Sequence, residues 1–229
     1  MSIKILTDNI KSGSFGPLYY IYGEEEYLKT YYFNSLKDKA MPDLPEFNLI
    51  EFDSKSFDYD DFCNSVNSYP VMAEKKLVTV TDFDNSLLKK EFNKDFVAFL
   101  KDIPDYCTVV FFDTYLKAAS SSNPLLKVLG VCDCVAVDVK KLDTTALVNW
   151  MLKQFKAKNK QIDKQDVYYI LDLADDDMFT LSNEIVKLCS YVQGDTVTRA
   201  DIDLLVTKSI ETNRFEIGNA FVIAIIKRF

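Results

Sequence analysis

The class of fold can be predicted from the stretch Leu18-Tyr19-Tyr20-Ile21-Tyr22-Gly23-Glu24-Glu25-Glu26-Tyr27-Leu28. Its first five residues are aromatic or aliphatic, and such a run predicts a β-strand. Gly23 marks a turn, and from Leu28 to Ala40 apolar residues recur every four positions, which predicts an amphipathic helix. A strand, a turn and a helix in this order are typical of α/β proteins.

Four more apolar runs follow in the first part of the chain, and helical patterns separate them. The runs at 77–81 and 108–112 are nearly continuous, as expected of parallel strands covered on both faces. Alternating strands and helices predict right-handed crossovers, and hence a parallel five-stranded α/β sheet with flanking helices in residues 1–141. The predicted strands cover 18–22, 47–52, 77–81, 108–112 and 134–137, and the predicted helices cover 28–40, 59–66 and 88–100.

After residue 142 the strand patterns vanish and only helical stripes remain. Short linkers between these stripes predict a small antiparallel helical bundle in residues 142–210. The predicted helices cover 147–155, 167–174, 178–192 and 198–206, with caps at Asp143 or Thr144, at Asp163, and at Thr198 with Asp201. Residues 211–229 begin another helical pattern and end in an apolar run from Ala220, too short for a bilayer. We interpret this segment as the start of a truncated further domain.

The composition limits the function classes. The 229 residues include 6 glycines and 6 prolines, which favours a helix-rich fold over a β architecture with many turns. The net charge of −8 argues against binding of nucleic acid through the overall field, so the expected partners are proteins. The chain has no histidine, which excludes Ser-His-Asp hydrolysis, Cys-His proteolysis and His-ligated zinc.

The cysteines and the first residues of the chain indicate the cellular compartment of the protein. The cysteines, without CxxC spacing, lie in or beside apolar runs, as reduced and buried thiols of a cytosolic protein do. Met1-Ser2-Ile3-Lys4 lacks the apolar stretch of a signal peptide, and nothing before residue 219 resembles a membrane span. We expect a soluble, cytoplasmic protein with no membrane contact. The cysteines are Cys63, Cys107, Cys132, Cys134 and Cys189.

A parallel sheet followed by a helical bundle suggests a nucleotide site at the turn after the first strand. A phosphate loop needs G-x-x-x-x-G-K-[ST] there, but the chain has Gly23 followed by three glutamates, which suit a helix N-terminus and repel a triphosphate. Asp82 and Asp84 follow the third predicted strand, about where ATPases hold magnesium. Because the chain lacks the lysine of a phosphate loop, we interpret both as solvated loop carboxylates and not as metal ligands.

Two other groups of possible metal ligands are explained by local structure. Cys132 and Cys134 have no second pair to complete a metal site, so core packing is favoured. The acidic residues Asp172 and 175–177 lack the spacing of a calcium loop and fit helix ends. We therefore expect no cofactor, no metal and no catalytic residue.

Several phrases together resemble the delta subunit of the bacterial DNA polymerase III clamp loader. They occur in the family's order over essentially the whole chain: 17–28 (PLYYIYGEEEYL), 69–80 (YPVMAEKKLVTV), 181–188 (LSNEIVKL) and 213–217 (NRFEI). The resemblance implies an AAA+-like fold that has lost nucleotide binding, in a subunit without intrinsic catalysis that belongs to a DNA polymerase holoenzyme. It also implies that the subunit binds the ring-shaped sliding clamp (beta) and helps to open it during replication.

The resemblance also implies a binding site. In the family a pair of apolar residues at the tip of a helix enters a hydrophobic pocket of the clamp, and Val71 and Met72 match that pair, with Tyr69 and Pro70 before them. Family members often carry a bulkier aromatic residue where this chain has Met72. Assembly with gamma/tau and delta-prime type subunits is expected to be weak if the collar domain is missing, and DNA is contacted only within the full complex.

From the residues alone, the favoured interpretation of residues 69–72 is ordinary packing beneath the sheet. The resemblance reverses that preference and favours a clamp-binding role for these residues. Two other functions stay open: an AAA+ ATPase with a degenerate phosphate loop, and a generic helical adaptor that binds some other protein.

Overall fold

A computed structural model describes residues 2–88, 90–116, 123–174 and 176–207. The chain divides into two compact units, Met1–Lys141 and Leu142–Phe229. The segment 211–229, with its apolar run and the phrase at 213–217, lies outside the described residues. In the part of the chain that is described, no helix is long and apolar enough to cross a membrane.

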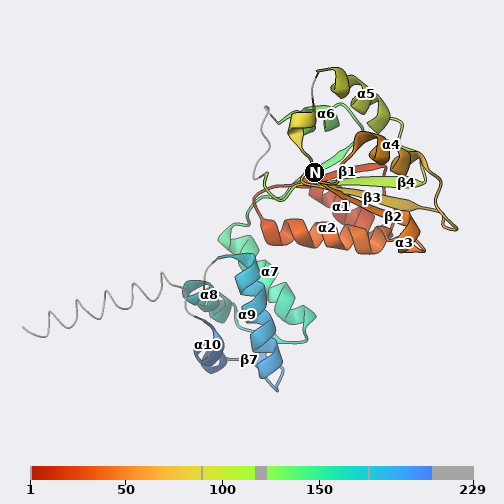
Figure 1. The fold of residues 1–229 in the computed structure, drawn as a ribbon. Helices are drawn as coiled ribbons and strands as arrows, with labels where there is room; N and C mark the ends of the chain where they lie inside the picture. Colours follow the sequence, from red (N-terminus) through yellow and green to blue (C-terminus); the bar gives the residue numbers. More distant parts are fainter. Residues whose placement is uncertain (1, 89, 117–122, 175, 208–229) are drawn as a thin grey trace, which may run out of the picture. The chain divides into compact units, whose positions relative to one another are not determined.

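The first unit is built on a five-stranded sheet in which every neighbouring pair is parallel (Figure 1). The strand order is β2-β3-β4-β1-β5, which confirms the predicted parallel α/β sheet. The strands are β1 (Leu18–Tyr22), β2 (Leu49–Asp53), β3 (Lys76–Thr81), β4 (Cys107–Phe112) and β5 (Val135–Asp138).

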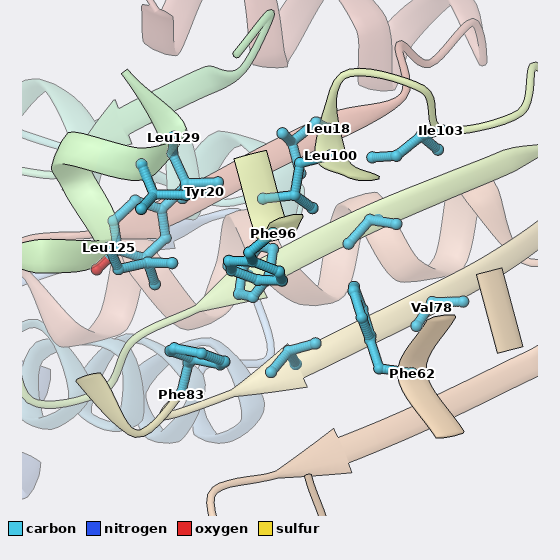
Figure 2. Packing of buried hydrophobic residues seen from close by; sticks show 14 of the residues in the cluster. Leu18, Tyr20, Phe62, Val78, Phe83, Phe96, Leu100, Ile103, Leu125 and Leu129 are labelled. Carbon is cyan, nitrogen blue, oxygen red and sulfur yellow. The ribbon is translucent and has the colours of Figure 1, made fainter. Parts of the chain in front are cut away.

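Helices cover both faces of this sheet, and each face has its own hydrophobic cluster. Alternate residues of β1 point to opposite faces: Tyr20 packs with Phe62, Phe96 and Leu125, whereas Tyr19 belongs to the other cluster. Figure 2 shows Phe62, Phe96 and Leu125 reaching into the first cluster from α4, α5 and α6. Burial on both faces explains the continuous apolar runs of β3 and β4. The helices are α1 (Ser2–Ser12) and α2 (Glu26–Ala40) on one face, and α4 (Tyr59–Asn67), α5 (Lys90–Leu100) and α6 (Pro124–Leu129) on the other.

Up to residue 207, where the description ends, the second unit packs four helices together with a small sheet. Side chains at Asp143, Asp163 and Asp177 cap α7, α8 and α9, and Thr198 forms a capping box with Asp201 at α10. The prediction that strands vanish after residue 142 is wrong, because β6 and β7 pair in parallel. The elements are α7 (Thr144–Ala157), β6 (Gln161–Ile162), α8 (Lys164–Leu173), α9 (Met178–Tyr191), β7 (Thr196–Val197) and α10 (Arg199–Leu205).

The first unit also differs from expectation in two places. Residues 2–12 form α1, which the sequence analysis did not predict, and Leu6 of that helix is fully buried. The run predicted as a strand from residue 47 begins as a single helical turn, α3 (Pro45–Asn48), and becomes extended only at Leu49. This turn forms because Pro45 suits the first position of a helix, and it leaves Asn48 completely buried.

Candidate partner-binding site

The four residues Tyr69–Met72, here called the tip, lie between α4 and β3. They are at the amino edge of the sheet, the edge where its parallel strands begin. Met72 is 88% exposed, Tyr69 79% and Val71 46%, while Pro70 is partly buried. This exposure contradicts ordinary packing of the tip beneath the sheet. An exposed row of apolar side chains is typical of surfaces that bind other proteins.

Contacts from other segments hold the tip in place. The buried amide of Asn48 accepts a hydrogen bond from the Val71 backbone N–H (2.7 Å) and donates one to the Val71 carbonyl oxygen (2.9 Å). The Tyr69 ring lies 5.1 Å from the ring of Tyr106, whose hydroxyl donates to the carbonyl oxygen of Asn67 at 2.6 Å. The tip is thus supported from the start of β2 and the start of β4.

A buried lysine supports the beginning of the tip. The Lys76 ammonium donates to the carbonyl oxygen (3.0 Å) and the hydroxyl (2.7 Å) of Ser68. Burial lowers the pKa of Lys76 below its ordinary value, because a charged ammonium is poorly solvated there. These two bonds offset part of that cost, so Lys76 both begins β3 and ties the chain at the end of α4.

The backbone at the tip is strained. Met72 has a φ of +51°, in the left-handed region that costs residues other than glycine about 1–2 kcal/mol. Such conformations persist where the surroundings fix them, and they concentrate at functional sites. The hydrogen bonds to Val71 supply that constraint on the backbone of the residue before Met72.

A cavity of about 300 Å³ lies at the same edge of the sheet. Lys39, Lys75 and Lys76 line it, together with residues of the chain after α1 and α2. The carbonyl ends of helices carry a partial negative charge that attracts cations. Lys39 lies in the last turn of α2, Lys75 donates to the carbonyl oxygen of Asp105 (2.6 Å) and Lys76 donates to Ser68, so contacts within the chain explain these lysines.

The opposite, carboxyl edge of the sheet is where a nucleotide site would lie in this topology. Gly23 follows β1 with a φ of +130°, and a Cβ there would come within 2.3 Å of the Val139 carbonyl oxygen. The buried Lys29 ammonium donates to the carbonyl oxygens of Gly23 (3.1 Å) and Thr114 (2.9 Å). Glu25 caps α2 by accepting from the Tyr27 N–H. The chain's own groups thus make the contacts at this turn.

Carboxylates near the strand ends are also used within the chain. Asp82 accepts from the backbone N–H (2.7 Å) and hydroxyl of Thr114. Asp84 caps the short helix Asn85–Leu87. Asp113 accepts from the Tyr20 hydroxyl, and burial together with Asp113 raises the pKa of that tyrosine. Within the described residues, no three carboxylate or thiol side chains converge as metal ligands would.

The paired cysteines behave as core residues. Burial raises the pKa of Cys134 to about 12 and also raises that of Cys132. The Cys132 thiol donates to the Val128 carbonyl oxygen at 3.3 Å. All five cysteines are free thiols.

Sequence reasoning missed the residues that support the tip. Asn48 was assigned to a strand, and nothing in its neighbours along the chain points to Val71, 23 residues later. Lys76 and Tyr106 are ordinary residues of a strand and a loop in the sequence. Only Pro45 could have indicated that Asn48 precedes the strand, because proline favours the first position of a helix and Asn48 ends the helical turn that Pro45 begins.

Comparisons with known proteins agree with this architecture. A family model described as DNA polymerase III, delta subunit, matches residues 19–136, which is just over half of the chain. The DNA polymerase III subunit delta of Bacillus subtilis is 25% identical over 222 residues, covering 93% of this chain and 63% of the relative. The probable DNA polymerase III subunit delta of Aquifex aeolicus is 22% identical over 203 residues, covering 86% and 56%.

The chain therefore spans less than two thirds of the length of these curated relatives. The solved structure of the Bacillus subtilis DNA clamp loader delta protein superposes with a TM-score of 0.72 at 22% identity, covering 100% of this chain and 69% of that one. This match shows an AAA+-like fold, and the family model extends over most of the first unit. The chain belongs to the family of DNA polymerase III delta subunits.

Proposed function

We propose that this chain is a non-catalytic clamp-loader subunit that binds the sliding clamp through the tip and helps to open the ring during replication. The observation that carries the proposal is the exposed pair Val71 and Met72, held by hydrogen bonds at the amino edge of the sheet. The membership of the delta family supports it, because the pair lies where the family's clamp-binding residues are expected.

The energy available from the pair is sufficient for a small binding hot spot. Complete burial of one exposed side chain of this kind contributes roughly 1.5–3 kcal/mol. Because Met72 is 88% and Val71 46% exposed, the pair contributes roughly 2–4 kcal/mol. Methionine adapts its shape to an apolar pocket, and a few central residues dominate most interfaces. Tyr69 and Pro70 would then lie at the border of the contact.

The arrangement at the carboxyl edge favours this function over that of an ATPase. Three glutamates follow β1, and the Lys29 ammonium bonds to carbonyl oxygens of the chain. A triphosphate needs backbone N–H groups and a lysine directed toward it. We therefore propose that the subunit acts by binding, with neither cofactor nor metal.

We also propose the wider setting of this activity. The partners are the sliding clamp and loader subunits of the gamma/tau and delta-prime type, with DNA contacted only within the full complex. The setting is the bacterial cytoplasm, in keeping with five unbridged thiols. Assembly with the other loader subunits is expected to be weak if the chain lacks a collar domain.

The test is calorimetric titration of the chain with the purified sliding clamp of the same organism. The double variant Val71→Asp, Met72→Asp is compared with the matched control Val131→Asp, Leu204→Asp, which adds the same charge at apolar residues exposed elsewhere. We expect the parent and the control to bind the clamp equally well. The tip variant, whose folding is checked by circular dichroism, should bind at least 100-fold more weakly. Equal binding by the tip variant, or none by the folded parent, would support the generic adaptor instead.

A further inference from the structure

We propose that Asn48 is a positioning residue: its buried amide ties the segment before β2 to the tip and so sets the geometry in which Val71 and Met72 meet a partner. The inference rests on the proposed function of the tip. Nothing in the sequence places Asn48 in a binding role, and its side chain, being fully buried, contacts no partner itself.

The amide of Asn48 is completely used by two separate backbone segments. Its nitrogen donates to the carbonyl oxygens of Asp43 (2.7 Å), Leu44 (3.3 Å) and Val71 (2.9 Å), and its oxygen accepts from the Val71 N–H (2.7 Å). Both backbone groups of Val71 are therefore held by one side chain. Because Asn48 directly precedes β2, the tie joins the tip to the sheet itself.

Only a primary amide of this length satisfies the site. The site needs an oxygen that accepts and a nitrogen that donates, both on one planar group. A carboxylate of the same shape has no donor and would face the carbonyl oxygens, and a hydroxyl is too short to bridge two segments. A buried polar group left without its partner is costly, so the amide and the backbone of Val71 require each other.

Two strained residues flank this tie. Leu44 and Met72 both have a positive φ, +49° and +51°, although neither is a glycine. Leu44 supplies a carbonyl oxygen to Asn48, and Met72 follows the residue that Asn48 holds. Strain of this kind is retained only where contacts over-determine the conformation. The position of both residues next to the same amide indicates that Asn48 maintains the two conformations together.

The expected consequence is a pre-organised tip. When the binding-competent conformation is populated only in part, the apparent dissociation constant rises by the inverse of that fraction. Without the two bonds to Val71, the residues 69–72 are free to leave their strained conformation. A fall of the competent fraction to about one tenth raises the dissociation constant about tenfold.

The experiment compares the parent, Asn48→Ala and Asn9→Ala in titrations with the purified sliding clamp. Asn9→Ala is the matched control, because it removes a side-chain amide of the same unit that bonds to the Tyr19 hydroxyl instead. Amide hydrogen exchange is measured at Val71 and at Val110 of the central strand β4. If Asn48→Ala does not fold, Asn48→Ser, which keeps a polar group too short for the bridge, takes its place.

We expect Asn9→Ala to bind as the parent does and Asn48→Ala to bind at least tenfold more weakly. Exchange at Val71 should accelerate much more than exchange at Val110, where only the general loss of stability acts. Binding by Asn48→Ala within twofold of the parent would overturn the inference while leaving the proposed function intact. Equal acceleration of exchange at both amides would also overturn it, since it would show a general loss of stability. Absence of binding by the folded parent would remove the proposed function and this inference with it.

Discussion

Two substitutions of Met72 separate its roles in binding and in stability. Met72 is 88% exposed, so truncation removes little apolar burial from the folded chain. Met72→Ala keeps the cost of a left-handed residue, whereas Met72→Gly relieves about 1–2 kcal/mol of it and adds about 0.5–1 kcal/mol of backbone entropy. We therefore expect the glycine variant to be more stable than the alanine variant by roughly 0.5–1 kcal/mol.

Under the proposed function, both variants lose the same contact with the sliding clamp. Removal of a methionine that becomes fully buried costs roughly 1.5–3 kcal/mol, which weakens clamp binding about 10- to 150-fold. Urea denaturation gives the stabilities, and calorimetric titration with the sliding clamp gives the affinities. The reasoning is refuted if the glycine variant is the less stable of the two, or if either variant binds as tightly as the parent.

Three further predictions concern the first unit. Gly23→Ala places a methyl group against the Val139 carbonyl oxygen. It should lower the free energy of unfolding, measured by urea denaturation, by roughly 2–4 kcal/mol. A free energy equal to that of the parent would contradict this. Lys29→Met removes the buried ammonium that donates to the carbonyl oxygens of Gly23 and Thr114, and should lower the free energy of unfolding by roughly 1.5–3 kcal/mol in the same assay; an unchanged free energy would contradict this. Burial raises the pKa of Cys107 and Cys134 to about 12 from 9.0, so the folded chain keeps protons that the unfolded chain releases. The contribution of these thiols to the free energy of unfolding is therefore complete below pH 9 and is lost as the pH rises toward 12, and Cys107→Ala should reduce this loss. The same loss between pH 9 and 12 in the parent and in Cys107→Ala would contradict this.

Much of the fold was predictable because its causes are local in the sequence. Strands β1, β3 and β4 are buried on both faces, and this burial requires the apolar runs by which they were found. The caps at Asp143 and Asp163 were predictable for a similar reason, because a cap bonds to backbone groups only two or three residues away. Secondary structure with such local causes can be predicted from the pattern of neighbouring residues in the sequence.

The elements that were missed depend on distant partners. β6 and β7 contain two residues each and exist because Gln161 meets the chain near Asp195, which no periodicity in the sequence records. The exposure of the tip is a similar case. Its apolar residues favour burial when considered alone, and they are exposed because Asn48 and Tyr106, from two other segments, hold them at the surface. The resemblance to the delta family, unlike the residues alone, indicated an exposed tip.

The strand order has a consequence for how the chain folds as it is synthesised. Leu18 of β1 pairs with Val109 and Tyr19 with Val135, so β1 has no strand neighbour until the chain has grown by about ninety residues. β2 and β3 follow each other much more closely, with Leu49 paired with Leu77, and closure of their shorter loop costs less entropy. The β2–β3 side of the sheet, to which the tip is connected, is thus assembled early, while β1 stays unpaired and exposed to aggregation until β4 is synthesised.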